Sequence, residues 1–363
     1  SLVKALTIGG AMVDTIAIVE DELIERISLS NSGKTFLLLE QGSKTEATSI
    51  STHCGGGAVN AAVSLARQGF ETAVIAKVGN DSRADLVRQT LQSEAISTHT
   101  LLTTKEAPTG ASTIISAHDR NAAIFTFRGA NTCLRSSDFD PAHFNVDLIY
   151  VSTLSGNSAD ALPSIVQLKE QGAKLCVNPG VRQITSRFAD LWSLLPHIDV
   201  LAINRLEAEA FVRQAVAELA GNENATLRRI AAAGLASIEK PGYSRFDVAR
   251  ALLSGLRGLG ARTTLLTDGR FGAFVGLEKA TLFCATVETD VASTAGAGDA
   301  FVSTYCGFHS SGAKPELALQ AATINAASVV GVADSNSGLM QRNALLTRVA
   351  EKNLAAKLVC FSE

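Results

Sequence analysis

The segment STAGAGDAF at residues 293–301 is a glycine-rich turn that runs into a helical pattern. Small residues let backbone N–H groups approach an anion closely, and the start of a helix adds positive potential there. Asp299 falls in the first turn of this helix. Its carboxylate could take a proton from an attacking hydroxyl while the helix end stabilises a migrating phosphoryl group. The other interpretation is that Asp299 only favours the helix dipole, and the segment alone does not decide between them.

Two familiar phosphate-binding loops fail to explain this turn. A P-loop ends in Gly-Lys-Ser or Gly-Lys-Thr, and residues 293–301 contain no lysine. A dinucleotide-binding fingerprint has the pattern Gly-x-Gly-x-x-Gly early in the chain, and here Phe301 stands where the third glycine would be. The sequence therefore argues against an NAD-dependent oxidoreductase.

A second glycine-rich turn precedes another helical pattern, in the segment CGGGAVNAAVSLARQG at residues 54–69. Glycines permit a ligand to approach the backbone closely. Asn60, in the first turn of the helix, can both donate to and accept from a polyol hydroxyl. A structural turn followed by a capping asparagine is the alternative.

Short apolar runs that end in Gly, Asn or Asp alternate with helical patterns along the chain. We predict strands at residues 5–10, 73–79, 148–153, 175–179, 200–204 and 263–269. We predict helices at residues 58–68, 83–92, 159–171, 206–219, 226–237 and 245–256. This alternation indicates a parallel sheet covered by helices on both faces, in which ligands bind beyond the carboxyl ends of the strands.

Two stretches interrupt the alternation. Residues 15–53 contain three short apolar runs and no good helix, and residues 110–128 have the pattern of a hairpin with its turn at 118–121. Together they would form a small antiparallel sheet outside the main one. Such a sheet is either a lid over a site or a mere extension of the fold.

The composition favours a small ligand over a polyanion. The chain has 363 residues, of which 46% are hydrophobic, and a formal net charge of −3. No run of Lys or Arg marks a nucleic-acid or membrane surface, so we expect neither partner. The six cysteines form no C-x-x-C pair, so we expect no zinc site and buried thiols in a reducing cytosol. The first residues lack a signal-peptide pattern, and we expect a cytoplasmic protein.

The two glycine-rich segments resemble the signatures of the ribokinase-like (PfkB) carbohydrate kinases. Residues 56–69 resemble the first signature, and residues 294–299 resemble the second, usually written Asp-Thr-x-Gly-Ala-Gly-Asp. Four further segments match family motifs in the expected order: Gly9-Gly10 with Asp14, residues 77–81, residues 204–207 and residues 267–272. The resemblance spans nearly the whole chain.

The resemblance implies an α/β fold of the ribokinase-like kind, a three-layer sandwich with a mostly parallel central sheet and a small antiparallel β lid. Residues 1–14, 53–109 and 129–363 would form the main domain, which binds nucleotide and substrate. Residues 15–52 and 110–128 would form the lid, whose closure over the sugar would exclude water. A homodimer through the lid is a further expectation, because unpaired strand edges seek partners.

The resemblance also implies an activity and a role for each matching residue. The activity would be transfer of phosphate from ATP to a hydroxyl of a small sugar or sugar derivative. Asp299 would be the base, and the backbone donors to the phosphoryl group would be Gly296, Ala297 and Gly298. The acceptor would be held by Asp14, Gly56, Gly57 and Asn60. The nucleotide would be bound by Asn204, Thr267, Gly269, Gly272 and Asn325. Mg²⁺ would be attracted, through its waters, by Glu207.

One departure from the family pattern concerns a monovalent cation. The aspartate that usually opens the second signature is replaced by Ser293. That aspartate commonly helps to hold K⁺, so we do not expect a strong cation dependence. The stretch from Asn204 to Thr267 also looks longer than usual, chiefly through residues 221–260, and the sequence assigns that insertion no role.

Two alternatives to a sugar kinase stay open. A nucleoside kinase would keep the same fold, with Phe36 and Phe127 as candidates to stack on a base. A non-catalytic ligand sensor would also keep the fold, but the presence of Asp299 and its glycines argues against it. The sequence does not identify the sugar or the hydroxyl.

Overall fold

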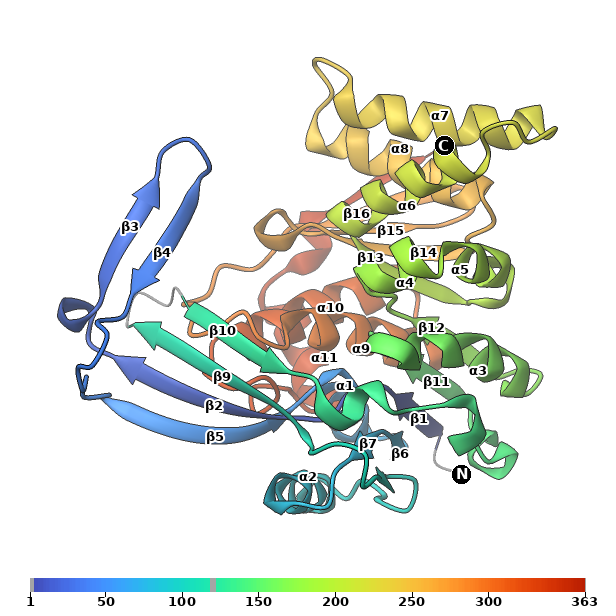
Figure 1. Ribbon diagram of the computed structural model, residues 1–363. Coiled ribbons are helices and arrows are strands. Elements are labelled where there is room, and N and C mark those ends of the chain that lie inside the picture. The colour runs from blue at the N-terminus through green and yellow to red at the C-terminus, as the bar shows by residue number, and fades with distance from the viewer. Residues whose placement is uncertain (1–2, 118–121, 363) are drawn as a thin grey trace.

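The residues that the computed structural model describes, 3–117 and 122–362, form a main sheet of nine strands (Figure 1). Its order is β17-β16-β15-β14-β13-β12-β11-β1-β6. The parallel part consists of β6 (Glu71–Ile75), β1 (Lys4–Ile8), β11 (Leu148–Val151), β12 (Lys174–Val177), β13 (Val200–Asn204) and β14 (Thr263–Thr267). Each of these strands coincides with one predicted from the sequence.

Antiparallel strands complete the β14 edge of the main sheet, and the sequence did not predict them. They are β15 (Ala273–Gly276), β16 (Ala280–Cys284) and β17 (Leu358–Ser362). Only Leu277, Glu278 and Lys279 separate β15 from β16, which is a hairpin spacing. The sheet is therefore parallel for most of its width and antiparallel at one edge.

Helices cover both faces of the main sheet, which gives the predicted three layers. Neighbouring strand residues point to opposite faces. Tyr150 packs in a core with α1 (Gly57–Arg67), α9 (Ala297–Ser310), α10 (Pro315–Val330) and α11 (Arg342–Glu351). Ile149 packs on the other side with α3 (Leu162–Leu168), α4 (Val181–Ser186), α5 (Phe188–Leu194), α6 (Arg205–Glu218), α7 (Ala225–Glu239) and α8 (Arg245–Gly258). Helix α2 (Ser82–Ser93) packs beside α1.

A separate small sheet has the order β10-β9-β2-β5 and lies to one side of the main sheet (Figure 1). Its strands are β2 (Met12–Val19), β5 (Ser49–Gly55), β9 (Gly110–Ala117) and β10 (Ala122–Phe127). Strand β9 pairs with β10, and β2 with β5, in antiparallel fashion, whereas β2 and β9 run parallel. The separate sheet predicted from the sequence is thus present, with one parallel pairing inside it. The turn predicted at 118–121 lies outside the described residues.

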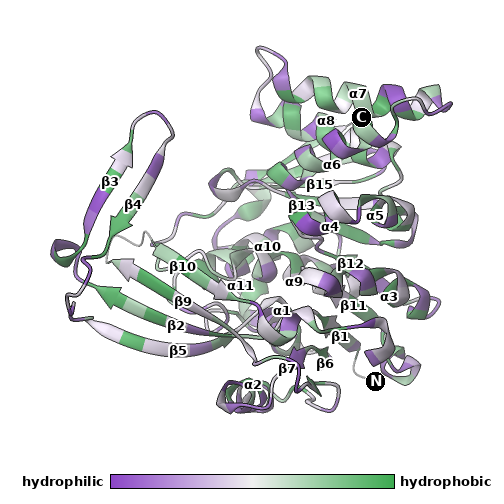
Figure 2. Ribbon diagram, in the orientation of Figure 1, coloured by the Kyte–Doolittle hydropathy of each residue, from purple (hydrophilic) through white to green (hydrophobic). Residues whose placement is uncertain are grey.

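Strands β3 (Glu25–Leu29) and β4 (Lys34–Leu38) form a two-stranded sheet of their own, apart from the small sheet within which their residues were predicted. A short parallel pair, β7 (Lys77–Val78) with β8 (Leu102–Thr103), follows β6. Apolar residues occur on β4 and β10 as well as in the main sheet (Figure 2). On these outlying strands several are exposed, including Phe36 at 46%, Ile124 at 59% and Phe125 at 61%.

Candidate active site

Helix α9 begins at a turn that only glycine can make. Gly296, the residue before the helix, has φ of +79°, in the left-handed region. A Cβ atom on Gly296 would lie 2.4 Å from the backbone oxygen of Ser335. At Gly298, by contrast, an added Cβ would meet nothing within 4 Å, and the residue lines a cavity. The turn is therefore packed on one side and open on the other.

The Asp299 side chain is partly buried and accepts two long hydrogen bonds. Asn60 Nδ2 donates to Oδ2 at 3.4 Å, and the Tyr150 hydroxyl donates to Oδ1 at 3.4 Å. Burial raises the pKa of the Asp299 carboxyl to about 6, and the two hydrogen bonds offset this rise only in part. A carboxylate with such a pKa is charged at neutral pH and is basic enough for proton abstraction.

Neighbouring side chains fix the orientation of the Asn60 amide. Its Oδ1 accepts from Ser335 Oγ at 2.9 Å and from Asn336 Nδ2 at 3.2 Å. Because the oxygen is occupied in this way, the NH₂ group is the end that meets Asp299. Ser335 and Asn336 follow α10 in a loop without a recognisable motif, so nothing in the sequence pointed to them.

The glycine turn before α1 brings backbone close to the same carboxylate. Gly56 has φ of +93°, and a Cβ atom there would lie 2.6 Å from the oxygen of Gly10. A Cβ on Gly57 would lie 2.7 Å from Ser152 Oγ and 3.5 Å from Asp299 Oδ1. These glycines allow the first strand, the turn and Asp299 to converge.

Asp14, on β2 of the small sheet, points toward this glycine turn. A Cβ atom on Gly55 would lie 2.6 Å from Asp14 Oδ2 and 2.8 Å from Ser335 Oγ. Ser112 Oγ donates to Asp14 Oδ1 at 2.5 Å. Burial raises the pKa of Asp14, while the bond from Ser112 and the charge of His53 lower it. The small sheet thus contributes a carboxylate next to the turn that carries Gly57.

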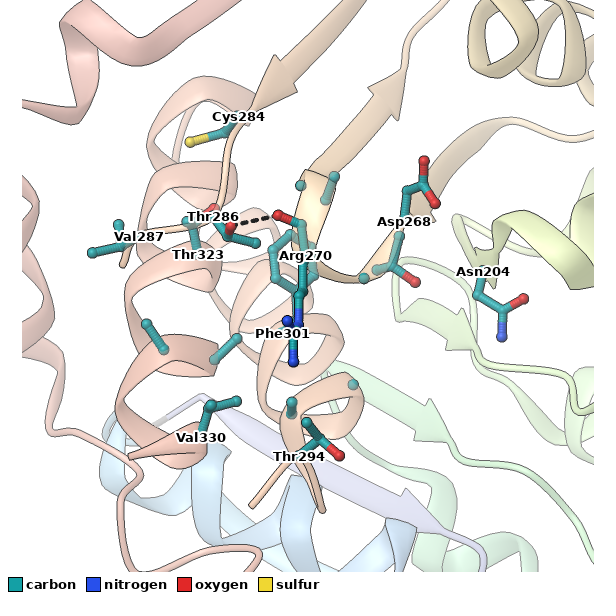
Figure 3. Close-up of a pocket in the computed structure, with 18 of the residues that line it drawn as sticks. Asn204, Asp268, Arg270, Cys284, Thr286, Val287, Thr294, Phe301, Thr323 and Val330 are labelled. Carbon is teal, nitrogen blue, oxygen red and sulfur yellow. Dashed lines mark hydrogen bonds between the residues drawn. The ribbon is translucent and has the colours of Figure 1, made fainter. Parts of the chain in front are cut away.

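A cavity of about 800 Å³ opens beside the start of α9 (Figure 3). Four of the five predicted nucleotide-binding residues line it: Asn204, Thr267, Gly269 and Gly272. Ala297 and Gly298 line it as well. The wall formed by α9, α10 and the segment after β16 is largely apolar and includes Val287, Phe301, Ala326, Ala327 and Val330. The cavity therefore joins an apolar wall to the glycine turn.

The structure places Asn325, the fifth predicted nucleotide-binding residue, away from the cavity. This residue is fully buried in α10 and does not line the cavity. Its amide nitrogen donates to Thr304 Oγ1 at 2.8 Å, and its oxygen accepts from the backbone nitrogen of Met340 at 2.9 Å. Both polar ends serve the packing of α10, because the residue lies on the inner face of the helix while Ala326 and Ala327 reach the cavity.

Asn204 and Glu207 form a capping box at the start of α6. Asn204 Oδ1 accepts from the Glu207 nitrogen at 2.8 Å, and Glu207 Oε1 accepts from the Asn204 nitrogen at 3.0 Å. Glu207 is buried, which raises the pKa of its carboxyl, and it lies behind Asn204 rather than in the cavity wall. Within the described ranges, no group of three or more His, Cys, Asp or Glu side chains could hold a metal ion. These residues could therefore hold Mg²⁺ only if the ion kept several of its waters and was bound mainly by those waters and by substrate phosphates.

The turn after β14 contains an ion-pair cluster that sequence reasoning missed. Asp268, whose side chain is 7% exposed, accepts from Arg205 Nε at 3.2 Å and from two nitrogens of Arg245 at 3.0 and 2.6 Å. Arg245 is the first residue of α8, within the insertion to which the sequence assigned no role. The only sequence signal was an acidic residue inside the motif TDGRFG. The insertion therefore contacts the turn at residues 267–272 directly.

Phe127, a candidate for base stacking, lies on the face of the small sheet opposite to Asp14. It pairs with Ala111, which in turn pairs with Val13. Asp14 and Ser112 pair one residue further along and point to the opposite face. Phe36 is on β4, outside the small sheet.

A helix start that faces a large cavity, with a carboxylate of raised pKa beside it, defines a candidate site for phosphoryl transfer. A family model described as pfkB family carbohydrate kinase matches residues 8–342. The chain therefore belongs to the pfkB family of carbohydrate kinases, which are phosphotransferases, as its resemblance to that family implied.

Relatives with known names agree with this family. Ribokinase of Mus musculus is 29% identical over 168 residues, which cover 45% of this chain and 50% of that protein. Deoxyribokinase of Salmonella typhi is 23% identical over 327 residues, which cover 89% of this chain and 94% of that protein. The chain thus matches only half of the mouse protein but nearly the whole of the bacterial one.

Solved structures confirm the fold. Ribokinase from Thermotoga maritima has a TM-score of 0.71 at 17% identity, covering 96% of this chain and 100% of that one. Arabidopsis thaliana ribokinase complexed with ribose and ATP has a TM-score of 0.72 at 17% identity, covering 96% and 99%. At such identities the likeness establishes the ribokinase-like fold alone. Among the described residues, no helix is long and apolar enough to cross a membrane.

Proposed function

We propose that this protein transfers the γ-phosphate of ATP to a hydroxyl of a small sugar or sugar derivative. The observation that carries the proposal is Asp299, a carboxylate with a pKa raised to about 6, at the glycine turn where α9 begins. It lies between the large cavity and the turn that carries Gly57. A base in this position can reach an acceptor hydroxyl while the phosphate lies at the helix start.

In the proposed reaction, Asp299 takes the proton of the acceptor hydroxyl as the hydroxyl oxygen attacks the γ-phosphorus of ATP. The bond from that phosphorus to its bridging oxygen breaks, and ADP leaves. The first N–H groups of α9 have no acceptors within the helix and would stabilise the transferring group. Among the residues proposed for this role, Gly298 has the best support, because a Cβ atom added there would meet nothing within 4 Å. The N–H of Ala297 donates to the Thr294 oxygen at 3.3 Å, and Gly296 shapes the turn.

The acceptor is proposed to lie between the small sheet and α1. Asp14 and the backbone at Gly56 and Gly57 would bind its hydroxyls, and Asn60 would both touch it and hold Asp299. Ribokinase and deoxyribokinase relatives support a sugar acceptor. A nucleoside kinase from Methanocaldococcus jannaschii has the same fold, with a TM-score of 0.70, so a nucleoside acceptor is left to experiment.

ATP and Mg²⁺ are the proposed cofactors. A putative ribokinase II from E. coli has been solved in complex with ATP and Mg²⁺. In this chain, Asn204, Thr267, Gly269 and Gly272 line the cavity and would contact the nucleotide. Glu207 would attract Mg²⁺ through water, and the ion would neutralise charge on the phosphates.

A strong dependence on K⁺ is not proposed, and contacts near Ser293 support this. The backbone nitrogens of Ala292 and Ser293 both donate to the Val330 oxygen, at 2.8 and 3.2 Å. Ser293 Oγ accepts from the Ala295 nitrogen at 3.1 Å. The segment is therefore held by direct protein contacts. A rate that drops more than about tenfold when K⁺ is replaced by tetramethylammonium would contradict this.

Three further proposals concern the surroundings of the site. The segments 15–52 and 110–128 are proposed as a lid, with the rest of the chain as the main domain. Exposed apolar side chains on β4 and β10 support a homodimer through this lid, and light scattering in solution would test it.

Five of the six free cysteines are buried, which suits a reducing cytoplasm.

The experiment that tests the function is a panel of ketoses, aldoses, sugar acids, phosphosugars and nucleosides with Mg²⁺-ATP. Thermal stabilisation and coupled ADP release are measured for each compound. A sugar that both stabilises the protein and releases ADP would support the proposal and name the acceptor. A preference for nucleosides would overturn the substrate, and no response to ATP itself would overturn the activity in favour of a ligand sensor.

A further inference from the structure

Three arginines surround the turn between β14 and β15, and they differ in how their charges are balanced. Arg205 is the first residue of α6 and Arg245 the first of α8. Arg270 belongs to the turn itself, in the short helix Gly269–Phe271. The family motif specifies threonine and glycines in this turn, so none of the three is assigned by it.

Asp268 balances two of these cations. Its buried carboxylate pairs with Arg205 at 3.2 Å and with Arg245 at 2.6 Å. Arg205 has a second acidic partner in Glu209, at 3.4 Å. Because both oxygens of Asp268 are engaged, the acid nearest to Arg270 along the chain is not available to neutralise it.

Arg270 faces the cavity as an uncompensated charge. Its side chain is exposed, and among the described residues no carboxylate forms an ion pair with it, including Glu288 of the cavity wall. Figure 3 shows the side chain extending from the turn into the cavity in the direction of Thr294, just before α9. The guanidinium therefore points toward the helix start that attracts anions.

The backbone that carries Arg270 is held on both sides. Thr286 Oγ1 donates to the Arg270 oxygen at 2.7 Å. The next residue, Phe271, lies 4.9 Å from the guanidinium carbon of Arg245 and 5.0 Å from the ring centre of Phe246, both in α8. The insertion thus holds the turn in place, and its Arg245 occupies the carboxylate of Asp268. Among the described residues that line the cavity, Arg270 is the cation that has no ion pair.

We propose that Arg270 binds the phosphate chain of the nucleotide. The apolar wall of Val287, Ala326 and Ala327 suits a base, and the start of α9 suits the terminal phosphate. A guanidinium between them meets the phosphates with paired N–H donors in a geometry that matches two phosphate oxygens. This inference rests on the proposed function, since it requires a nucleotide in the cavity.

The test compares binding of ATP, ADP and adenosine to the wild type, Arg270→Ala, Arg270→Lys and a control, Arg213→Ala. Arg213 pairs with Glu239 on the surface of α6 and α7, away from the cavity. Loss of a charge-assisted hydrogen bond should weaken ATP and ADP binding about tenfold or more in Arg270→Ala. Adenosine binding should be unchanged, and Arg270→Lys should retain part of the affinity.

The outcomes separate this inference from the proposed function. If the wild type binds ATP and Arg270→Ala binds it equally well, the role of Arg270 is wrong while the nucleotide site stands. An equal loss for adenosine would also contradict it, because the side chain would then support the base or the fold. If the wild type binds no ATP, the proposed function itself fails.

Discussion

The turns before α1 and α9 both begin with a glycine at positive φ, yet they face different surroundings. At Gly57, in the first turn of α1, an added Cβ would lie 2.6 Å from the Ser152 Cβ, so the space is already filled by protein. At Gly298, in the first turn of α9, an added Cβ would meet nothing. The same residue type thus permits protein to pack at one turn and leaves room for a ligand at the other. The packed first turn helps to assemble the site, and the open space at the second agrees with the phosphate binding that we propose there.

The largest expected effect comes from the carboxylate between the two turns. Asp299→Asn removes the proposed base and should lower kcat about a thousandfold or more. The variant should still fold, because the folded state binds the proton of the Asp299 carboxyl more tightly than the unfolded state does. With a pKa raised from 3.8 to about 6, the Asp299 carboxylate disfavours folding above pH 6, and this penalty shrinks as pH falls toward 3.8.

Steady-state kinetics and thermal unfolding at pH 7 check this prediction together. The variant should melt at or above the wild-type temperature while losing turnover. Near-normal turnover in a folded variant would remove Asp299 from the role of base.

The two glycines form a matched pair for the next test. Gly57→Ala should lower the free energy of unfolding by about 1–3 kcal/mol, because the methyl group overlaps Ser152. Gly298→Ala should leave stability unchanged or raise it by up to about 1 kcal/mol, since alanine favours helix. Its methyl group would enter the cavity and weaken nucleotide binding. Urea unfolding and ATP titration measure both quantities, and the reverse pattern would contradict the comparison.

The smallest expected effect is a shift in pH dependence. The Asn60 amide lowers the pKa of Asp299, so Asn60→Ala should raise that pKa and move the acid limb of kcat/KM to higher pH. Ser335→Ala keeps the Asn60 donor and removes only one of its supports, so its shift should be smaller. A pH profile of both variants tests whether the shift is larger in Asn60→Ala than in Ser335→Ala. An unshifted acid limb in Asn60→Ala would mean that the bond to Asp299 has no influence on the base.

Asn60→Ala should also raise the sugar KM more than the ATP KM.

Much of the fold followed from local pattern. Continuous apolar runs such as 148–153 and 200–204 correspond to β11 and β13, because a parallel strand is buried on both faces. The edge strands β15 and β16 were missed although two apolar runs flank Leu277–Lys279. Strand β17 lies so far along the chain that its pairing with β16 is a long-range contact, which local pattern does not contain.

The candidate site was predictable where a residue acts through its own backbone or its place in a helix. Gly296, Gly298 and Asp299 fall at a helix start, which sequence spacing locates. Asn325 lies on the inner face of α10, which the sequence could not show because helical position does not reveal which face of α10 meets the cavity. Ser335, Asn336 and Arg245 come from loops or helices distant in sequence, and their partners are brought near only by packing.

By itself, the sequence determined the family, the alternation of strands and helices, and the two glycine turns, because these depend on short-range sterics and hydrophobic period. The tertiary structure decided the rest. Burial among α1, α9 and β11 raises the pKa of Asp299. The pairing of Asp268 with Arg205 and Arg245 leaves Arg270 without an ion pair in the part of the chain that the structure describes. Charge balance and desolvation depend on distances between residues far apart in the chain, and only the folded structure sets those distances.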